Sequence, residues 1–156
     1  MYIKIRKKWR YLYPAVDSDG YTLDFLLTAK RDAKAAKRFL TKALNAVHTH
    51  EPRVINVDKK PAYPPAVEQL QEEERLPEGE KVRLVKYLNN IVEQDHRGIK
   101  RLVNPGMGFG SFNSARRTLK GYEAMNMIRK GQIKNVGKDD VVGQISFINQ
   151  ILGLAA

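Results

Sequence analysis

The chain has 156 residues, 42% of them hydrophobic, which suits one folded domain with a buried core and excludes a wholly disordered chain. Its 28 basic and 17 acidic side chains give a net charge of +11, which favours a polyanionic partner, either nucleic acid or an anionic membrane surface. The absence of cysteine excludes disulfides, zinc fingers and thiol nucleophiles, and no apolar run is long enough for a transmembrane helix.

The first part of the chain is typical of an antiparallel meander followed by a helix. Three strands are predicted here, at residues 2–6, 9–16 and 21–27. Aromatic and β-branched residues dominate these segments, and the run DSDG at residues 17–20 predicts a turn between the second and third strands. A helix is expected over residues 33–47, with Asp32 as its N-cap.

The rest of the chain alternates helices with short strands. Strands are predicted at residues 53–57 and 82–85, helices at 61–74, 88–103 and 113–130, and an amphipathic segment at 141–152. The Gly-rich stretch at residues 106–112 follows a helix rather than a strand, so it predicts a flexible loop rather than a nucleotide cradle. This order predicts an α/β fold with one layered sheet of mixed strand directions.

Charge is distributed unevenly along the chain. Residues 1–60 carry a net charge of +8 and residues 96–138 a net charge of +9, whereas residues 61–95 carry a net charge of −4. The acidic middle is typical of a solvated helix and loop. The two basic blocks instead predict a surface that contacts phosphates.

Asp58 is the first candidate for a catalytic side chain. It follows the short apolar strand predicted at residues 53–57, and ligand-binding groups of open α/β sheets lie at the carboxyl ends of strands. The simpler interpretation is that Asp58 ends the strand or caps the following turn. The residues by themselves leave both interpretations open.

Glu93 is the second candidate, and it lies on the polar face of the helix predicted at residues 88–103. One arc of the helical wheel is apolar and consists of Leu88, Ile91, Val92, Ile99, Leu102 and Val103. The other arc is polar and consists of Asn89, Asn90, Glu93, His96, Arg97 and Lys100. Glu93 and Lys100 are two turns apart, so a metal-binding carboxylate and a phosphate-binding cation would share one face. The alternative is a solvated face with a Glu93–Arg97 ion pair.

Other titratable residues near these candidates are expected to be structural. Asp95 falls in the apolar arc, where we expect a buried partner from the basic N-terminal strands. His48 and His50 lie at a helix end, where a positive charge suits the helix dipole, and His96 is expected at the surface.

The segments VINVDKKPAYPPAV around Asp58 and YLNNIVEQDHRGIKRLV around Glu93 resemble the second and third blocks of the DDE transposases. These are insertion-sequence enzymes with a retroviral-integrase-like, ribonuclease H-like core. The chain is most similar to the insertion sequence six family, through KWRYLYPAVDSDGYTLDFLL, AKAAKRFL and GFGSFNSARRTLKGYEAMNMIRKGQ. The two carboxylates have 34 residues between them, and Lys100 matches a basic residue that many such elements keep after the glutamate.

The resemblance implies DNA strand cleavage and transfer at the ends of a mobile element, in the cytoplasm of a bacterium or archaeon and close to the nucleoid. It implies three carboxylates that bind two divalent ions, Mg²⁺ or Mn²⁺, which activate the attacking group and stabilise the leaving oxygen. Asp58 would be the second of these catalytic, metal-binding carboxylates and Glu93 the third. The residues expected to bind DNA are Lys59, Lys60, Asn89, Asn90, His96, Arg97, Lys100 and Arg101.

The chain departs from the family pattern at its start. The family's first carboxylate belongs to a D-E-T-Y-like block on the first strand, and Tyr2 matches the tyrosine of that block, so the first Asp is expected upstream of Met1. The family's helix-turn-helix region is expected upstream as well. We therefore expect residues 1–133 to form an integrase-like, ribonuclease H-like core with a truncated first strand, and residues 134–156 to form an amphipathic tail.

Three functions compete at this point. The first is a transposase fragment that acts in the intact protein but is inactive as this chain alone, because one of three metal-binding carboxylates is missing. The second is an inactive DNA-binding remnant that pairs with full-length transposase as an inhibitor, or with copies of itself. The third is a ribonuclease H-like nuclease for RNA–DNA hybrids, which would need the same missing Asp.

Overall fold

The computed structural model describes residues 1–46, 52–76, 81–85 and 90–154. Within these ranges the description excludes the side chains of Lys81, Asn90, Ile91, Glu93, Asp95 and His96. The elements, in chain order, are β1 (Tyr2–Ile5), β2 (Lys8–Val16), β3 (Thr22–Thr28), α1 (Ala33–Leu44), β4 (Val54–Asp58), α2 (Tyr63–Glu72), β5 (Lys81–Val85), α3 (Asn90–Val103), η1 (Asn104–Gly106), α4 (Phe112–Arg129) and α5 (Val141–Leu152). Apart from the short helix η1, which the sequence did not predict, and from the exact ends, these are the predicted strands and helices in the predicted order.

The first three strands form an antiparallel sheet in the order β1-β2-β3, which confirms the predicted meander. Tyr2 lies opposite Tyr11, and Tyr11 lies opposite Thr28. The start of β1 and the end of β3 therefore lie at the same end of the sheet.

Two aspartate side chains close a turn and cap a helix, as predicted. The Asp17 carboxylate accepts hydrogen bonds from the backbone N–H groups of Asp19 at 2.9 Å and Tyr21 at 2.8 Å, which closes the turn between β2 and β3. The Asp32 carboxylate accepts from the N–H of Ala35 at 2.8 Å and so caps α1.

Among the predicted helix boundaries that differ from the structure are the end of α1 and the start of α2. α1 ends at Leu44, and the predicted end at Val47 lies outside the described residues. α2 begins at Tyr63, so Pro64 rather than Pro61 occupies its first turn. A proline is tolerated there because the N–H that it lacks has no partner within the helix.

The strands of the described residues form two sheets, rather than the single mixed sheet that the sequence predicts. β4 and β5 pair in parallel, from Val54 opposite Lys81 to Asp58 opposite Val85, and in the described part of the chain neither strand joins β1. Part of the free edge of β1 is occupied by another segment, which includes Phe109. The α/β class is therefore confirmed, whereas the ribonuclease H-like strand order is not.

The Gly-rich stretch that we predicted to be a flexible loop is fixed to β1. The N–H of Phe109 donates to the carbonyl of Lys4 at 2.9 Å, and its carbonyl accepts from the N–H of Arg6 at 2.8 Å, in a parallel bridge beside Ile5. The carbonyl of Gly110 accepts from Nε of Arg6 at 2.8 Å. Glycine content indicated conformational freedom, but it could not reveal that a strand edge would supply these hydrogen bonds.

Gly108→Ala is expected to destabilise the fold by about 2 kcal/mol. Gly108 has φ +117°, and a Cβ there would lie 2.7 Å from the backbone oxygen of Lys4, which is held by its hydrogen bond to Phe109. Gly106→Ala is the matched control, because nothing lies within 4 Å of the Cβ it would add. Urea unfolding followed by circular dichroism compares the two variants, and equal stabilities would contradict this role of Gly108.

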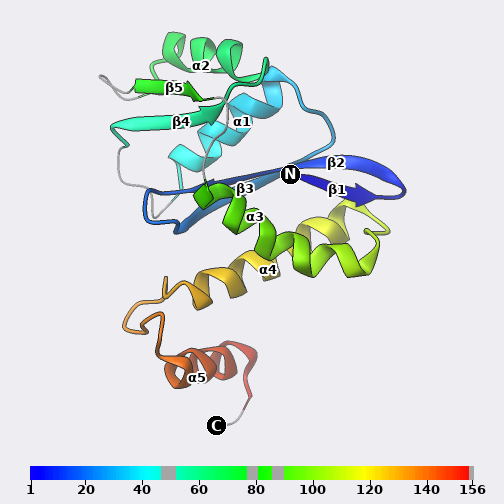
Figure 1. Ribbon diagram of the computed structural model, residues 1–156, viewed down its shortest axis with the longest axis vertical. Coiled ribbons are helices and arrows are strands. Elements are labelled where there is room, and N and C mark those ends of the chain that lie inside the picture. The colour runs from blue at the N-terminus through cyan, green and yellow to red at the C-terminus, as the bar shows by residue number, and fades with distance from the viewer. Residues whose placement is uncertain (47–51, 77–80, 86–89, 155–156) are drawn as a thin grey trace.

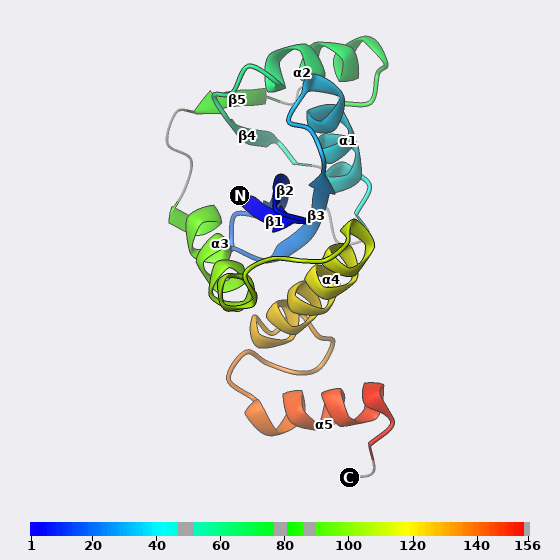
Figure 2. The same cartoon turned by 90° about the vertical axis from the view of Figure 1, so that its right-hand side faces the viewer.

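Two hydrophobic cores lie on opposite faces of the three-stranded sheet. Figures 1 and 2 show α1 and α2 over one face of this sheet and α3 and α4 over the other. The core beneath α1 and α2 consists of Tyr13, Leu26, Ala36, Phe39, Leu40, Val57, Tyr63, Ala66, Val67 and Leu70. The core beneath α3 and α4 consists of Ile3, Ile5, Leu12, Phe25, Leu27, Ile99, Val103, Ala115 and Leu119. Consecutive residues such as Leu12 and Tyr13 alternate between the two cores, because successive side chains of a strand point to opposite faces. The sheet is therefore the middle layer of the fold.

α3 packs on the sheet through only part of its predicted apolar arc. Ile99 is 2% exposed and Val103 is also buried, but Leu102 is 50% exposed. The contact therefore follows the i, i+4 stripe of Ile99 and Val103 and is narrower than predicted. Leu88 and the side chain of Ile91 lie outside the described residues.

α5 confirms that the predicted amphipathic segment is helical, and Figure 1 shows it beyond α4, away from both cores. None of its residues is buried. Its exposed large apolar side chains are Val141, Val142, Ile145, Ile151 and Leu152. In the described part of the chain, no helix combines the length and apolar character needed to cross a bilayer.

Candidate active site

Asp58 lies at the carboxyl end of β4, as predicted, and its side chain is 42% exposed. The turn after it is closed by backbone groups, since the N–H of Lys60 donates to the carbonyl of Asp58 at 2.6 Å and the N–H of Lys59 donates to the carbonyl of Val85 at 3.0 Å. The Asp58 carboxylate accepts no backbone hydrogen bond from the described residues, so the interpretation as a turn cap has no support. The carboxylate is available for another ligand.

Two cations lie beside the Asp58 carboxylate. Its Oδ2 atom is 3.5 Å from Nζ of Lys60 and 4.0 Å from Nη2 of Arg31. Arg31 also donates from Nη1 to the hydroxyl of Tyr2 at 3.2 Å, which ties the segment after β3 to the start of β1. Because these groups are partly exposed, the ion pairs orient the carboxylate more than they stabilise the fold.

The N-terminal amine of Met1 lies within electrostatic range of Asp58 and Arg31. It donates to the carbonyl of Leu12 at 2.8 Å. Burial lowers the pKa of this amine to about 6, the positive charges of Arg31 and Lys100 act in the same direction, and the negative charge of Asp58 opposes them. These interactions bring together the start of β1, the end of β4 and α3, and Figure 2 shows the N-terminus between β4 and α3.

The Met1 amine is expected to make the stability of this chain depend on pH. Through this group, the free energy of unfolding should rise by about 2 to 3 kcal/mol as the pH is raised from about 5.5 to about 8.5. The folded-state pKa of about 6 lies below the ordinary 8.0, so between these values the unfolded chain binds more protons than the folded chain. Urea unfolding across this range measures the rise. Acetylation of the amine should remove this rise. If the free energy of unfolding had the same pH dependence after acetylation, the assignment to the Met1 amine would be wrong.

Two buried tyrosines, Tyr13 and Tyr63, lie close to these charges. Burial raises the pKa of both hydroxyls. For Tyr63 the nearby Tyr13 and Asp58 act in the same direction and Arg31 opposes them. Both hydroxyls therefore stay protonated at neutral pH, which suits hydrogen-bond donation and excludes general-base catalysis by either.

α3 presents predicted DNA-binding cations at its C-terminal half. Arg97, Lys100 and Arg101 are exposed, and Lys100 lies near enough to the Met1 amine to lower its pKa. Lys100 and Arg101 also lie in the last turn, where a positive charge offsets the negative end of the helix dipole. Lys59, which follows Asp58 in the chain, is exposed as well.

Several residues singled out in the sequence lie outside what the structure describes. They are Asn89, His48 and His50, and the side chains of Asn90, Glu93, Asp95 and His96. The backbone of Glu93 lies in α3, the helix that carries Lys100. Proximity of the Glu93 and Asp58 carboxylates therefore stays a prediction, as does the alternative Glu93–Arg97 ion pair.

Sequence reasoning missed Arg31, Tyr63 and the Met1 amine as neighbours of Asp58, and Tyr13 as a neighbour of Arg31 and Tyr63. They come from four different segments, and no local pattern in any of them indicates a site. Their proximity depends on how β1, β3 and β4 are placed relative to one another, which periodicity does not determine.

The side chains around Asp58 can be compared with the ligands that Mg²⁺ and Mn²⁺ require. The described residues contain no group of three His, Cys, Asp or Glu side chains that could hold a metal ion. Asp58 itself fits, because its carboxylate is half-exposed and the neighbouring cations, at 3.5 and 4.0 Å, lie beyond close hydrogen-bond distance. Mg²⁺ is commonly held by one or two carboxylates, with water and substrate phosphates completing the coordination. Asp58 and Glu93 together would match that arrangement.

Comparison with known families matches residues 1–132 to a DDE domain, the domain of IS240-type transposases. The match includes β4 with Asp58 and α3 with Glu93, and it ends just after α4. The chain therefore belongs to the DDE transposases. Within that class, the chain belongs to the insertion sequence six family, in agreement with the resemblance seen in the sequence.

Individual relatives support this assignment. The transposase for insertion sequence-like element IS431mec of Staphylococcus aureus strain Mu50 is 36% identical over 129 residues, which is 83% of this chain and 55% of the relative. The transposase for insertion sequence element IS257 in transposon Tn4003, also from Staphylococcus aureus, shows the same values. The uncharacterized protein pYV0051 of Yersinia pseudotuberculosis is 35% identical over 74 residues, which is 47% of this chain and 69% of that protein. This chain thus spans about half the length of its staphylococcal relatives, and no solved structure matches it.

Proposed function

We propose that this chain is the catalytic core of an insertion-sequence transposase, which in the intact protein cleaves DNA at the element ends and transfers the strands to a target. The observation that supports this most is the placement of Asp58. It is a half-exposed carboxylate at the end of β4, within electrostatic range of the start of β1, with the cations Lys60 and Arg31 beside it. Family membership supplies the reaction class.

In this proposal Asp58 and Glu93 hold Mg²⁺ or Mn²⁺, which when bound would activate the attacking water or 3′-hydroxyl and neutralise charge on the leaving oxygen. Arg31 and Lys60 orient the Asp58 carboxylate. Lys59, Arg97, Lys100 and Arg101 hold phosphates of the DNA on either side of the scissile bond. Asn89, Asn90 and His96 would complete this DNA-binding surface.

We also propose that residues 1–133 form the core and residues 134–156 a separate tail, since none of the residues of α5 is buried. The protein would act where its DNA is, at the nucleoid in a bacterial or archaeal cytoplasm. Copies of the chain, or the full-length transposase, are the protein partners that this function suggests.

The test compares this chain with an extended form in which Asp-Glu-Thr takes the place of Met1. Because the Met1 amine and Asp58 interact, residues added immediately upstream of position 1 would extend the chain from a place near Asp58, and we expect the added Asp carboxylate there. In a plasmid strand-transfer assay with the DNA ends that flank the gene and Mg²⁺, we expect joining by the extended form and none by the original chain. Mn²⁺ titration followed by electron paramagnetic resonance should show about tenfold or more tighter binding by the extended form. Robust joining by the original chain, or equal Mn²⁺ affinities, would overturn this arrangement.

A second candidate is an inactive remnant that binds DNA and inhibits a full-length transposase by pairing with it. The observation in its favour is that the Asp58 carboxylate lies beside two cations, Lys60 at 3.5 Å and Arg31 at 4.0 Å, which compete with a metal ion for its charge. This candidate would be preferred if the extended form stays inactive and the original chain lowers strand transfer by an added full-length transposase. The ribonuclease H-like nuclease has no observation in its favour.

A further inference from the structure

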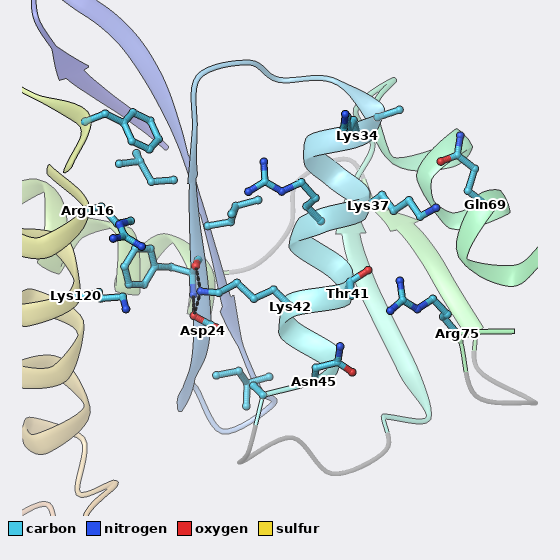
Figure 3. Close-up of a pocket in the computed structure, with 18 of the residues that line it drawn as sticks. Asp24, Lys34, Lys37, Thr41, Lys42, Asn45, Gln69, Arg75, Arg116 and Lys120 are labelled. Atoms are coloured by element: carbon cyan, nitrogen blue, oxygen red, sulfur yellow. Dashed lines mark hydrogen bonds and ion pairs between the residues drawn. The ribbon is translucent and has the colours of Figure 1, made fainter. Parts of the chain in front are cut away.

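A groove runs along the outer edge of β3, between helices that lie on opposite faces of the sheet (Figure 3). α1 forms one wall, α4 forms the other, and residues 23–27 of β3 form the floor. In the sheet order β1-β2-β3, β3 is an edge strand among the described residues. The lining residues include none of the residues placed in the candidate active site.

Cations from both walls line this groove. They are Lys34, Lys37, Arg38 and Lys42 on α1, Arg75 just after α2, and Arg116 and Lys120 on α4. The spacing of four residues puts Lys34, Arg38 and Lys42 on one stripe of α1, about 12 Å long, and Arg116 and Lys120 on one stripe of α4. Figure 3 shows Arg116 and Lys120 facing Lys42 across the groove, with Asp24 between them. Asp24 is the only acidic residue among the described residues that line the groove.

Three of these cations are used within the protein. Lys37 and Arg75 form ion pairs with Glu73. Lys42 binds at the sheet edge. Its Nζ donates to the Asp24 carboxylate at 2.5 Å and to the carbonyl of Phe25 at 2.7 Å, while the Asp24 carboxylate accepts from the N–H of Phe25 at 2.6 Å. Both backbone polar groups of Phe25 are therefore satisfied by side chains at the sheet edge. The four other cations are exposed, and none of them forms an ion pair with a described residue.

We infer that this groove binds the phosphate backbone of duplex DNA, at a second place separate from the candidate active site. The inference rests on the proposed function, which supplies DNA as the substrate. Four exposed cations on two facing walls match a polyanion, and DNA binding gains free energy by releasing counterions at each neutralised phosphate. The second surface would hold DNA that lies away from the reacting phosphate.

A second copy of the chain suits this groove less well. A two-fold contact would bring the same cations of both copies together, and like charges repel across an interface. Strand addition at β3 would need free N–H and C=O groups at the edge, but Lys42 and Asp24 already engage those of Phe25.

The test uses two double variants with the same change in net charge. Arg38→Gln with Arg116→Gln removes one exposed cation from each wall, and Arg117→Gln with Arg129→Gln removes two exposed cations of α4 that do not line the groove. Fluorescence anisotropy measures the binding of each full chain to a labelled duplex of about 30 base pairs over a range of salt concentrations, without metal. We expect the groove variant to lose about tenfold or more in affinity and about 2 units of the salt slope, and the control about threefold or less.

The other possible outcomes of these measurements would overturn the inference. Equal losses in the two variants would overturn the inference, because they would reflect net charge alone. It would also be overturned if the groove variant kept its DNA affinity but changed a dimer into a monomer in analytical ultracentrifugation, which would assign the groove to a second copy. Circular dichroism checks that both variants are folded. Because the binding assay needs no catalysis, an inactive extended form would count against the proposed reaction and leave this inference standing.

Discussion

Asp58→Asn is expected to lower strand transfer by the extended form at least about 10³-fold, which corresponds to about 4 kcal/mol of transition-state stabilisation. An amide has the shape of the carboxylate but lacks its charge, so it would hold a divalent ion poorly. The same variant should weaken Mn²⁺ binding about tenfold or more, a readout that does not depend on activity. Glu93→Gln is expected to behave in the same way.

The fold should tolerate the loss of the Asp58 charge. Its ion pairs with Lys60 and Arg31 are partly exposed and 3.5 and 4.0 Å long, so they contribute at most about 1 kcal/mol to the free energy of unfolding. Thermal unfolding followed by circular dichroism checks this. A loss of activity without a loss of structure would then be assigned to chemistry.

Glu73→Gln is the matched control for Asp58→Asn. Glu73 is also a partly exposed carboxylate with two basic neighbours, Lys37 and Arg75, and a hydrogen bond from Lys37 lowers its pKa below the ordinary value. It is the C-cap of α2, and its ion pairs join it to Lys37 and Arg75, neither of which is a candidate site residue. Strand transfer within about threefold of the parent is expected for Glu73→Gln. If Asp58→Asn also stayed within this range, the assignment of Asp58 would be wrong.

Ile99→Ala is expected to lower the free energy of unfolding by about 3 kcal/mol. Ile99 is 2% exposed and packs in the core that also contains Leu12 and Phe25. Removing three carbons there would leave a cavity, which costs more than the lost transfer free energy alone. Because Ile99 attaches α3 to the sheet, the loss would also loosen the helix that carries Glu93 and Lys100.

Leu102→Ala provides the control on the same helix. Leu102 is 50% exposed, so its truncation should cost within about 1 kcal/mol. Urea unfolding of the two variants measures the difference directly. If the two variants lost similar stability, the contact of α3 with the sheet would not pass through Ile99.

The order and type of the elements could be predicted because they depend on local properties. Asp17 and Asp32 close a turn and cap a helix through hydrogen bonds to residues a few positions away, so their effects are readable along the chain. Asp58 could be placed at a strand end for the same reason. Family resemblance then indicated which of the many carboxylates to consider, which periodicity by itself did not.

The amino-acid sequence by itself determined the strands and helices, the basic character and the family. Only the tertiary structure decided that Phe109 occupies an edge of β1, that Arg31 and the Met1 amine lie near Asp58, and that cations of α1 and α4 line one groove. Helix and strand periods act over a few residues, whereas these contacts join segments far apart in the chain. Their formation depends on which apolar faces pack together and on which free strand edge finds a hydrogen-bonding partner.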